Sequence, residues 1–310
     1  MTKRVVIGAN AHAVLSEALL RRRPDLEVRG RRYTDVTEDD LHWGEAYLGF
    51  RRPPLAGMGN IRWVHCTGAG VDAWLFPEEL PRDILLTRTA ESFGPMIAEW
   101  ALARALAFSQ QLGALAQDQQ QRRWQHRDVT MLRGTRAVIV GTGDVGSHVG
   151  RLFRALGCVV HGISRSGIGD QEVFSSSSTA ASLATEAARA DWLIVTLPLT
   201  AATRGMVGRG VLEACRGAVL MNAGRGAVVD ESLIPEALDK RWLRGAALDV
   251  FDVEPLPQES PLWDDPRVVI SPHISGPTTP IAALDGFLDC LNALERGGQP
   301  PTVVDRDRQY

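Results

Sequence analysis

The sequence predicts an α/β protein of two doubly wound domains with parallel sheets, one domain inserted into the other. Short apolar runs alternate with segments of helical spacing along nearly the whole chain, which is typical of parallel sheets covered by helices. The runs form two series separated by a long helical segment at 94–124, and a last helical segment follows the second series. We therefore expect a first domain of residues 1–94 and 276–310 that encloses a second domain of residues 95–275.

The first series contains a helix at 12–23 and short runs typical of strands. The candidate strands are RVVIG (4–8), LEVRG (26–30), EAYLGF (45–50) and IRWVHC (61–66). The segment 94–124 carries Pro95, which suits the first turn of a helix. A helix of this length exceeds the needs of one small domain, so we interpret it as a bridge between the domains and a subunit contact.

The second series contains more strand candidates with helices between them. The strand candidates are TRAVIVG (135–141), CVVHGIS (158–164), DWLIVTLP (191–198), RGAVLMNAG (216–224), LRGAALDVF (243–251) and RVVISP (267–272). Helical patterns at 145–157 and 230–242 lie between strands, and the pattern at 279–297 returns to the first domain. The polar run SSSST (175–179) is interpreted as a loop.

Composition and charge are those of an ordinary globular protein. The chain has 310 residues, 45% hydrophobic and 23% charged, with a formal net charge of −3. These values give no electrostatic reason to expect nucleic acid or a membrane as a partner. The arginine-rich stretch 19–32 has helical spacing and is interpreted as a solvated face. The four cysteines lack metal-ligand spacing and no targeting segment is visible, so we expect a reduced, cytoplasmic chain without a metal.

A glycine pattern after the first strand of the second series indicates a phosphate-binding loop. Gly141, Gly143 and Gly146 form G-x-G-x-x-G between an apolar strand and an amphipathic helix. Glycines let a pyrophosphate approach the backbone, and the helix N-terminus offers N–H groups and a positive dipole end. The alternative is a glycine-rich turn without a ligand. We assign Asp144 and Val145 to the same loop and expect the Asp144 side chain to point away from phosphate.

The residues after the next strand bear on the choice of nucleotide. An NAD-specific protein presents Asp or Glu to the ribose hydroxyls at this point. This chain presents Ser164, Arg165 and Ser166, and the first acid is Asp170. An arginine and two hydroxyls suit a 2′-phosphate, whereas an acid would repel it. The sequence therefore favours NADP, with NAD as the alternative.

Three chemically versatile residues stand at or just beyond the ends of later strands. They are Arg225 in NAGRG, Glu254 in DVFDVEPLP and His273 in SPHISG. Ligands bind at this edge of an open parallel sheet. Arginine grips a carboxylate through two N–H groups, and a glutamate favours the protonated form of a neighbouring histidine, which can donate to a carbonyl oxygen as hydride arrives. The ordinary alternatives are a surface charge, a helix-start acid and a core histidine.

The motifs together resemble the D-isomer-specific 2-hydroxyacid dehydrogenases, and within them the glyoxylate/hydroxypyruvate reductase A branch. The resemblance covers nearly the whole chain and rests on TGAGVD (67–72), the glycine loop, SRS, TLPLT, NAGRG, LDVFDVEPLP, ESPLW, PHIS and VDRDRQY. It implies a Rossmann nucleotide domain inserted into a flavodoxin-like substrate domain. It also implies an NADPH-dependent reductase that converts small 2-oxo acids to D-2-hydroxy acids.

The resemblance further implies roles for individual residues. Arg225 would bind the carboxylate and carbonyl of the 2-oxo acid, with Glu254 and His273 as the acid–base pair. The backbone of Ala69 and Gly70 would hold the carboxylate from the other domain. The other positions implied to bind the cofactor are Thr196, Leu197, Pro198, Thr203, Asn222, Ala223, Asp249, His273, Ser275 and Gly276.

Relatives of this kind dimerise through the region of the long helix. The apolar side chains that we assign to a homodimer contact there are Trp100, Leu102, Leu106 and Phe108. The expected partners are therefore a second copy of the chain and a small-molecule substrate.

Some positions depart from the resemblance, and other relatives differ in function. Thr279 stands where related reductases have an arginine, and their aromatic loop residue corresponds to Phe50 or Arg51. These differences put the preference for glyoxylate or hydroxypyruvate in doubt. Corepressors of the C-terminal-binding-protein type keep similar site residues, so a nucleotide-sensing binding protein is the alternative function. Formate dehydrogenases have glutamine in place of Glu254 and are disfavoured.

Overall fold

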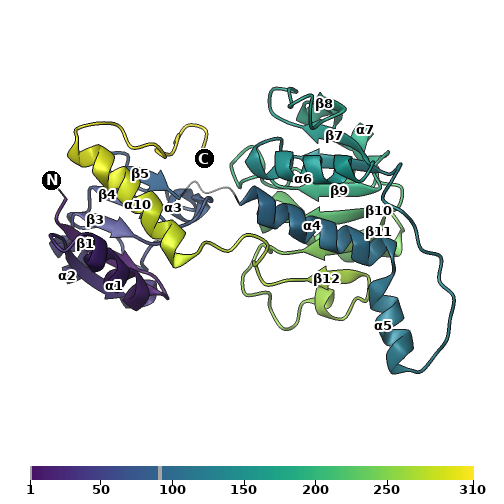
Figure 1. Cartoon of the computed structure of the whole chain (residues 1–310), viewed down its shortest axis with the longest axis horizontal. Helices are drawn as coiled ribbons and strands as arrows, with labels where there is room; N and C mark the ends of the chain where they lie inside the picture. The colour runs from purple at the N-terminus through teal and green to yellow at the C-terminus, as the bar shows by residue number, and fades with distance from the viewer. Residues whose placement is uncertain (1, 90–92) are drawn as a thin grey trace. The chain divides into compact units, whose positions relative to one another are not determined.

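The computed structural model describes residues 2–89 and 93–310 and divides the chain into two compact units (Figure 1). Met1–Glu91 and Thr278–Tyr310 form one unit, which we call the terminal unit. Ser92–Pro277 forms the other, which we call the inserted unit. Each unit contains its own parallel sheet. The predicted arrangement of one α/β domain inserted into another is therefore confirmed.

The sheet of the terminal unit has the strand order β2-β1-β3-β4-β5, which is the flavodoxin-like order, and all its strand pairs are parallel. Its strands are β1 (Arg4–Gly8), β2 (Glu27–Arg31), β3 (Ala46–Leu48), β4 (Trp63–Cys66) and β5 (Leu85–Arg88). Its helices are α1 (His12–Arg22), η1 (Tyr33–Asp35), α2 (Glu38–Trp43), α3 (Asp72–Leu75) and α10 (Pro280–Glu295). Strand β5 was not expected, because only its first two residues are apolar.

Helices cover both faces of this sheet because alternate residues of β1 enter different cores. Ile7 packs in a cluster with Leu19 of α1 and Phe287 of α10. Its neighbour Val6 packs in the opposite cluster with Leu41 of α2. The last helix, α10, contacts α1 and lies beside it in Figure 1. The expectation that the C-terminal helix returns to the first domain is confirmed.

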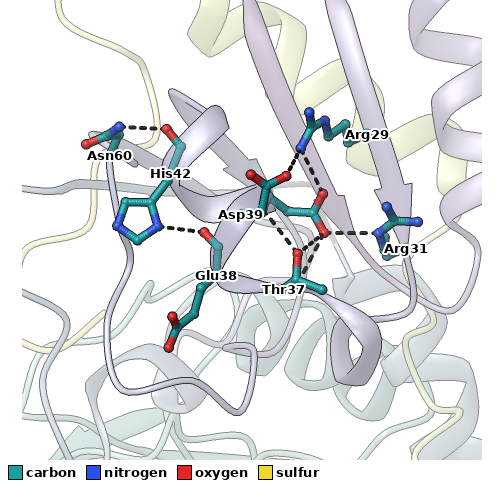
Figure 2. Close-up of polar contacts among 8 residues, drawn as sticks. Arg29, Arg31, Thr37, Glu38, Asp39, His42 and Asn60 are labelled. Atoms are coloured by element: carbon teal, nitrogen blue, oxygen red, sulfur yellow. Dashed lines mark hydrogen bonds and ion pairs between the residues drawn. The ribbon is translucent and has the colours of Figure 1, made fainter.

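Helix α2, which the sequence did not predict, begins in a reciprocal cap (Figure 2). Thr37 Oγ1 accepts the N–H of Asp40, and the Asp40 carboxylate accepts the N–H of Thr37, both at 3.2 Å. Arg29 and Arg31 of β2 donate to the same carboxylate, whose side chain is 1% exposed. Burial raises the pKa of Asp40, but Arg31 and Thr37 outweigh it and hold that pKa below its ordinary value. The cap thereby joins α2 to the edge strand.

The sheet of the inserted unit has the order β12-β11-β10-β9-β6-β7-β8, again with parallel pairs. Counted from the first strand of the unit, this is the Rossmann order with one additional strand after the sixth. The strands are β6 (Arg136–Val140), β7 (Val159–Ile163), β8 (Ser176–Ser178), β9 (Trp192–Val195), β10 (Ala218–Asn222), β11 (Leu243–Leu248) and β12 (Val268–Ile270). Every strand expected in the second series is present.

Helices also cover both faces of this second sheet. They are α4 (Gly94–Ser109), α5 (Leu112–Gln120), α6 (Asp144–Ala155), η2 (Ala180–Ser182), α7 (Leu183–Ala187), α8 (Arg209–Leu212), η3 (Gly226–Val228), η4 (Glu231–Leu233), α9 (Ile234–Asp239) and η5 (Pro261–Trp263). Helices α7, α8 and α9 share one core with β6 and β9–β11, while α4 packs against α6, as Figure 1 shows. Over residues 2–89 and 93–310, no helix has both the length and the apolar character needed to cross a membrane.

Two expectations about this unit were wrong. The segment 94–124 is not one helix: α4 ends at Ser109, Gln111 has a left-handed φ of 51°, and α5 follows. The run 175–179 is not a loop, because its centre forms the edge strand β8. The serines of β8 flank the buried imidazole of His161 in β7, at 2.7 Å from Nδ1 and 2.9 Å from Nε2. Strand β8 has no apolar residues because its serine hydroxyls form hydrogen bonds with His161 of the neighbouring strand β7.

Candidate active site

The site residues expected in the inserted unit gather at the carboxyl edge of its sheet, because each group follows the end of a parallel strand. The segments are 141–146 after β6, 164–166 after β7, 196–198 after β9, 222–225 after β10, 249–254 after β11 and 271–276 after β12. Thr203 lies further along the connection between β9 and α8. The edge therefore combines a candidate nucleotide site with the candidate acid–base residues.

The glycine loop fits a bound pyrophosphate. Gly141 has a left-handed φ of 112°, and a Cβ on Gly146 would lie 1.8 Å from the carbonyl oxygen of Gly141. These two glycines are required by the turn and by the packing of α6 on β6. A Cβ on Gly143 would meet no atom within 4 Å, so this glycine borders open space. Gly143 is the N-cap of α6 and no described side chain caps the helix, which leaves its N-terminus available to an anion.

Asp144 opens helix α6 next to this loop. Its Oδ1 lies 3.4 Å from Nδ1 of His148, one turn further along the helix. Val145 follows it within the first turn. The contact places the carboxylate beside the following turn of the same helix.

The turn after β7 presents two hydroxyls and a cation. Ser164 Oγ donates to the carbonyl of Ile168 at 3.0 Å, and Ser166 Oγ accepts the N–H of Ile168 at 3.3 Å. Arg165 lies between them and is exposed. Asp170 is bound within its own turn, where it accepts the N–H of Glu172 at 2.9 Å. The first acid after the strand is thus engaged by the backbone of its own turn.

His273 and Glu254 are in direct contact. The imidazole Nδ1 lies 2.8 Å from Glu254 Oε2, and the other carboxylate oxygen accepts the N–H of Phe251 at 3.1 Å. Burial raises the pKa of Glu254, but the bonds from His273 and Phe251 and the charge of Arg225 outweigh it, so the pKa lies below its ordinary value. Glu254 is therefore ionised at neutral pH and places a negative charge beside Nδ1 of His273.

The loop around His273 is held by Asp249, which follows β11. His273 has a left-handed φ of 53°, and its N–H donates to the main-chain oxygen of Asp249 at 2.8 Å. The carboxylate of Asp249 accepts the N–H of Ile274 at 3.0 Å and that of Ser275 at 2.8 Å. The side chain of Asp249 is fully buried. The residue that we assign to the nicotinamide half of the site thus also fixes the backbone of the candidate proton donor.

Arg225 lies in a loop shaped by Asn222. Asn222 is buried, accepts the N–H of Gly224 and donates to the carbonyl of Arg225, both at 3.1 Å. A Cβ on Gly226 would lie 1.9 Å from the carbonyl carbon of Phe251, so this loop packs against the segment that leads to Glu254. The half-buried Arg225 is therefore close enough for its charge to act on Glu254.

The other expected cofactor residues line neighbouring strand ends. Thr196 Oγ1 donates to the carbonyl of Gly141 at 3.2 Å and so joins the end of β9 to the glycine loop. Thr203 Oγ1 donates to the carbonyl of Pro198 at 2.7 Å, which stabilises the connection after β9. Leu197 stands between Thr196 and Pro198, Ala223 follows β10, and Ser275 and Gly276 lie in the loop after His273.

Ala69 and Gly70 belong to the terminal unit, in the loop after β4. Arg88 Nη1 donates to the carbonyl of Ala69, and the thiol of Cys66 donates to that of Gly70, both at 3.3 Å. Arg88 lies at the carboxyl end of β5. Because the sequence did not predict this strand, it did not indicate Arg88 either. Both carbonyls are held by the unit's own side chains, which orients the peptide groups between them.

The positions that we expect to differ from related reductases also lie in the terminal unit. Phe50 packs beside the same loop, since a Cβ on Gly68 would lie 2.7 Å from its ring. Arg51 stacks over Tyr33 at 5.8 Å from the ring centre. Thr279 is the N-cap of α10, where its hydroxyl accepts the N–H of Ala282 at 3.2 Å. Phe50 is thus the aromatic residue that borders the loop of Ala69 and Gly70.

Comparison with known proteins agrees with this geometry. The family model described as D-isomer specific 2-hydroxyacid dehydrogenase, NAD binding domain, matches residues 102–275. Glyoxylate/hydroxypyruvate reductase A of Serratia proteamaculans (strain 568) is 33% identical over 299 residues, which cover 93% of this chain and 93% of the relative.

Solved structures extend the comparison to the whole fold. A D-isomer specific 2-hydroxyacid dehydrogenase from Xanthobacter autotrophicus Py2, in complex with NADPH and MES, has a TM-score of 0.86 at 28% identity and full coverage of both chains. An NADPH-dependent glyoxylate/hydroxypyruvate reductase from Sinorhizobium meliloti, in complex with NADP and sulfate, has a TM-score of 0.85 at 28% identity, covering 99% of this chain and 100% of the other. Because the family model spans more than half of the chain and the Serratia relative aligns along nearly all of it, the chain belongs to the D-isomer-specific 2-hydroxyacid dehydrogenases, a family of NAD(P)-dependent oxidoreductases.

Proposed function

We propose that this chain uses NADPH to reduce a small 2-oxo acid, of the glyoxylate or hydroxypyruvate kind, to a D-2-hydroxy acid. The observation that carries the proposal is the pair of His273 and Glu254, in contact at 2.8 Å, with the charge of Arg225 acting on the same carboxylate. The names of the Serratia and Sinorhizobium relatives support the substrate class. The structures solved with NADPH and NADP support the cofactor.

The residues divide the reaction between them. The bound nicotinamide would supply a hydride to C2 of the substrate. His273, as an imidazolium, donates a proton to the C2 oxygen; Glu254 engages Nδ1, which leaves Nε2 as the donor. Arg225 binds the carboxylate and the carbonyl, and the backbone of Ala69 and Gly70 holds the carboxylate. Hydride and proton together convert the 2-oxo group to a hydroxyl.

The phosphate-binding residues would hold the dinucleotide across the same edge. Gly141, Gly143 and the N-terminus of α6 receive the pyrophosphate, and Arg165 with its flanking serines receives the 2′-phosphate. The expected residues at the ends of β9, β10 and β11 line the nicotinamide half.

A panel of 2-oxo acids, assayed separately with NADPH and NADH, tests the proposal. Glyoxylate and hydroxypyruvate should be reduced with NADPH, and chiral chromatography of the hydroxypyruvate product should show the D-isomer. Failure to reduce any 2-oxo acid with either cofactor would refute the reductase. Binding of NADPH without turnover would instead indicate a nucleotide-sensing protein.

Arg165→Ala is expected to raise the KM for NADPH about tenfold, with little change for NADH. A charge-assisted hydrogen bond to the 2′-phosphate is lost, and the exposure of Arg165 keeps the effect at the lower end of the range for such bonds. Steady-state kinetics with both cofactors provide the measurement. Arg151→Ala is the control, because Arg151 lies on α6 and pairs with Asp170 at 3.5 Å. Equal losses with NADPH and NADH would contradict the assignment of Arg165.

A two-fold homodimer is the expected assembly. Of the residues assigned to the contact, Trp100 is buried inside the inserted unit, with 6% exposure, and Phe108 is half-buried against Gly245. The same region still exposes a set of large apolar side chains, namely Met96, Leu106, Leu112, Leu115, Trp124, Val129 and Met131. Such a concentration is typical of a subunit interface. Light scattering at micromolar concentration should give twice the mass of the chain, and a monomer would contradict the prediction.

A further inference from the structure

Trp100 of α4 begins a series of buried hydrogen bonds that ends at the loop of His273. Its Nε1 donates to Ser271 Oγ at 2.9 Å, and Ser271 Oγ donates to Asp249 Oδ1 at 2.6 Å. Trp100, Ser271 and Asp249 are 6%, 4% and 0% exposed. All three belong to the inserted unit, so the series lies within one compact body.

The direction of these bonds is fixed by chemistry. An indole N–H can only donate, so Ser271 must accept from Trp100 with a lone pair. The single hydroxyl proton of Ser271 is then directed to Asp249. A fully buried carboxylate needs donors to offset its lost hydration, and Asp249 receives this hydroxyl in addition to two backbone N–H groups.

Asp249 in turn determines the conformation of the loop. It accepts the N–H of Ile274 and Ser275 with its carboxylate, and the N–H of His273 with its main-chain oxygen. His273 has a φ of 53°, a conformation that a residue with a side chain rarely adopts unless its surroundings enforce it. A carboxylate that rotates or shifts would release the N–H groups that follow His273, and the imidazole would lose its fixed direction.

Trp100 is itself held in place from the same helix. The guanidinium of Arg104, one turn further along α4, lies 4.7 Å from the centre of its ring. Burial lowers the pKa of Arg104, and the charge of Asp249 opposes that shift. The cation therefore stacks on the indole while its charge favours the buried carboxylate.

We propose that Trp100 is a positioning residue for the proton donor His273, acting through Ser271 and Asp249. The inference rests on the proposed reductase function and adds to it a residue that we had assigned to the subunit contact. Helix α4 thereby contributes to proton transfer through the loop of His273.

Trp100→Phe tests the proposal, because it removes the N–H and keeps an aromatic ring. The expected result is a kcat for 2-oxo acid reduction lower by roughly threefold to tenfold, with the KM for NADPH unchanged. Ser271→Ala should lower kcat at least as much. The double variant should be no worse than Ser271→Ala, because the two residues act in series.

Trp192→Phe is a matched control. Trp192 Nε1 also donates to a hydroxyl at 2.9 Å, that of Thr135, and the guanidinium of Arg244 lies 4.8 Å from its ring. It stands at the amino end of β9, away from the loop of His273. Its variant should keep the wild-type kcat. An equal loss of kcat in Trp192→Phe, or an unchanged kcat in Trp100→Phe, would overturn the proposal.

Amide hydrogen exchange provides a readout that does not depend on a substrate. In Trp100→Phe, the amides of His273, Ile274 and Ser275 should exchange faster than in the wild type and in Trp192→Phe. If the wild type reduces no 2-oxo acid but this exchange result is obtained, the reductase function fails while the support of the loop by Trp100 stands. Unchanged exchange at the three amides would overturn the role of Trp100, whatever the activity.

Discussion

His273→Ala is expected to lower kcat for 2-oxo acid reduction by about 10²–10⁴, the usual contribution of a positioned general acid. The imidazole has both features that this role requires: a carboxylate partner on Nδ1 and a backbone fixed by Asp249. Hydride addition to C2 builds negative charge on the oxygen, and only a donor held in place neutralises it as it forms. The KM for NADPH should change little, because the glycine loop follows a different strand.

The surface histidine His42 provides the control for this substitution. It is exposed on α2, where its Nδ1 lies 2.8 Å from the carbonyl oxygen of Glu38. His42→Ala should retain the wild-type kcat. Steady-state rates with NADPH and saturating 2-oxo acid provide the comparison. A loss of less than about tenfold in His273→Ala would place the proton donor elsewhere.

Much of this site is predictable because parallel sheets bring distant residues to one edge. Arg225, Glu254 and His273 are far apart in sequence, yet each follows a strand of one sheet, so their approach needs only the strand order. The strand order alone does not predict the direct contact between the side chains of Glu254 and His273. The two side chains meet because Asp249 fixes the loop of His273 and the N–H of Phe251 orients the carboxylate of Glu254.

The features that escaped prediction depend on contacts distant in sequence. Helical spacing continues across Gln111, where the helix breaks. The side chains of Gln110 and Gln111 donate to the carbonyls of Thr130 and Asp128, contacts made only after the chain has folded back. In the sequence, Trp100 is indistinguishable from the other apolar residues of a helix. Its proposed role depends on a hydrogen bond to Ser271, which is far away in the sequence.

Glu254→Gln is expected to move the descending limb of the pH–rate profile for reduction to lower pH. The pKa of Glu254 lies below its ordinary value, so the carboxylate is charged throughout the neutral range and loses its charge only as the pH falls through that lowered pKa. At neutral and alkaline pH it therefore keeps a negative charge beside the imidazole that gives up the proton in reduction. Glutamine keeps the size and an oxygen acceptor for Nδ1 but has no charge at any pH.

The expected change in rate follows from the hydrogen bond between His273 and residue 254, whose acceptor loses its charge in Glu254→Gln. A hydrogen bond to a charged group contributes about 1.5–3 kcal/mol, so reduction on the alkaline side of the limb should slow by about tenfold to 150-fold. At pH values below the descending limbs of both proteins, the two rates should converge. Oxidation of the D-2-hydroxy acid needs a neutral imidazole, so its rising limb should also move to lower pH in Glu254→Gln. Profiles measured in both directions from pH 5 to 9 provide the test, and coincident limbs in wild type and variant would show that the charge of Glu254 does not act on His273.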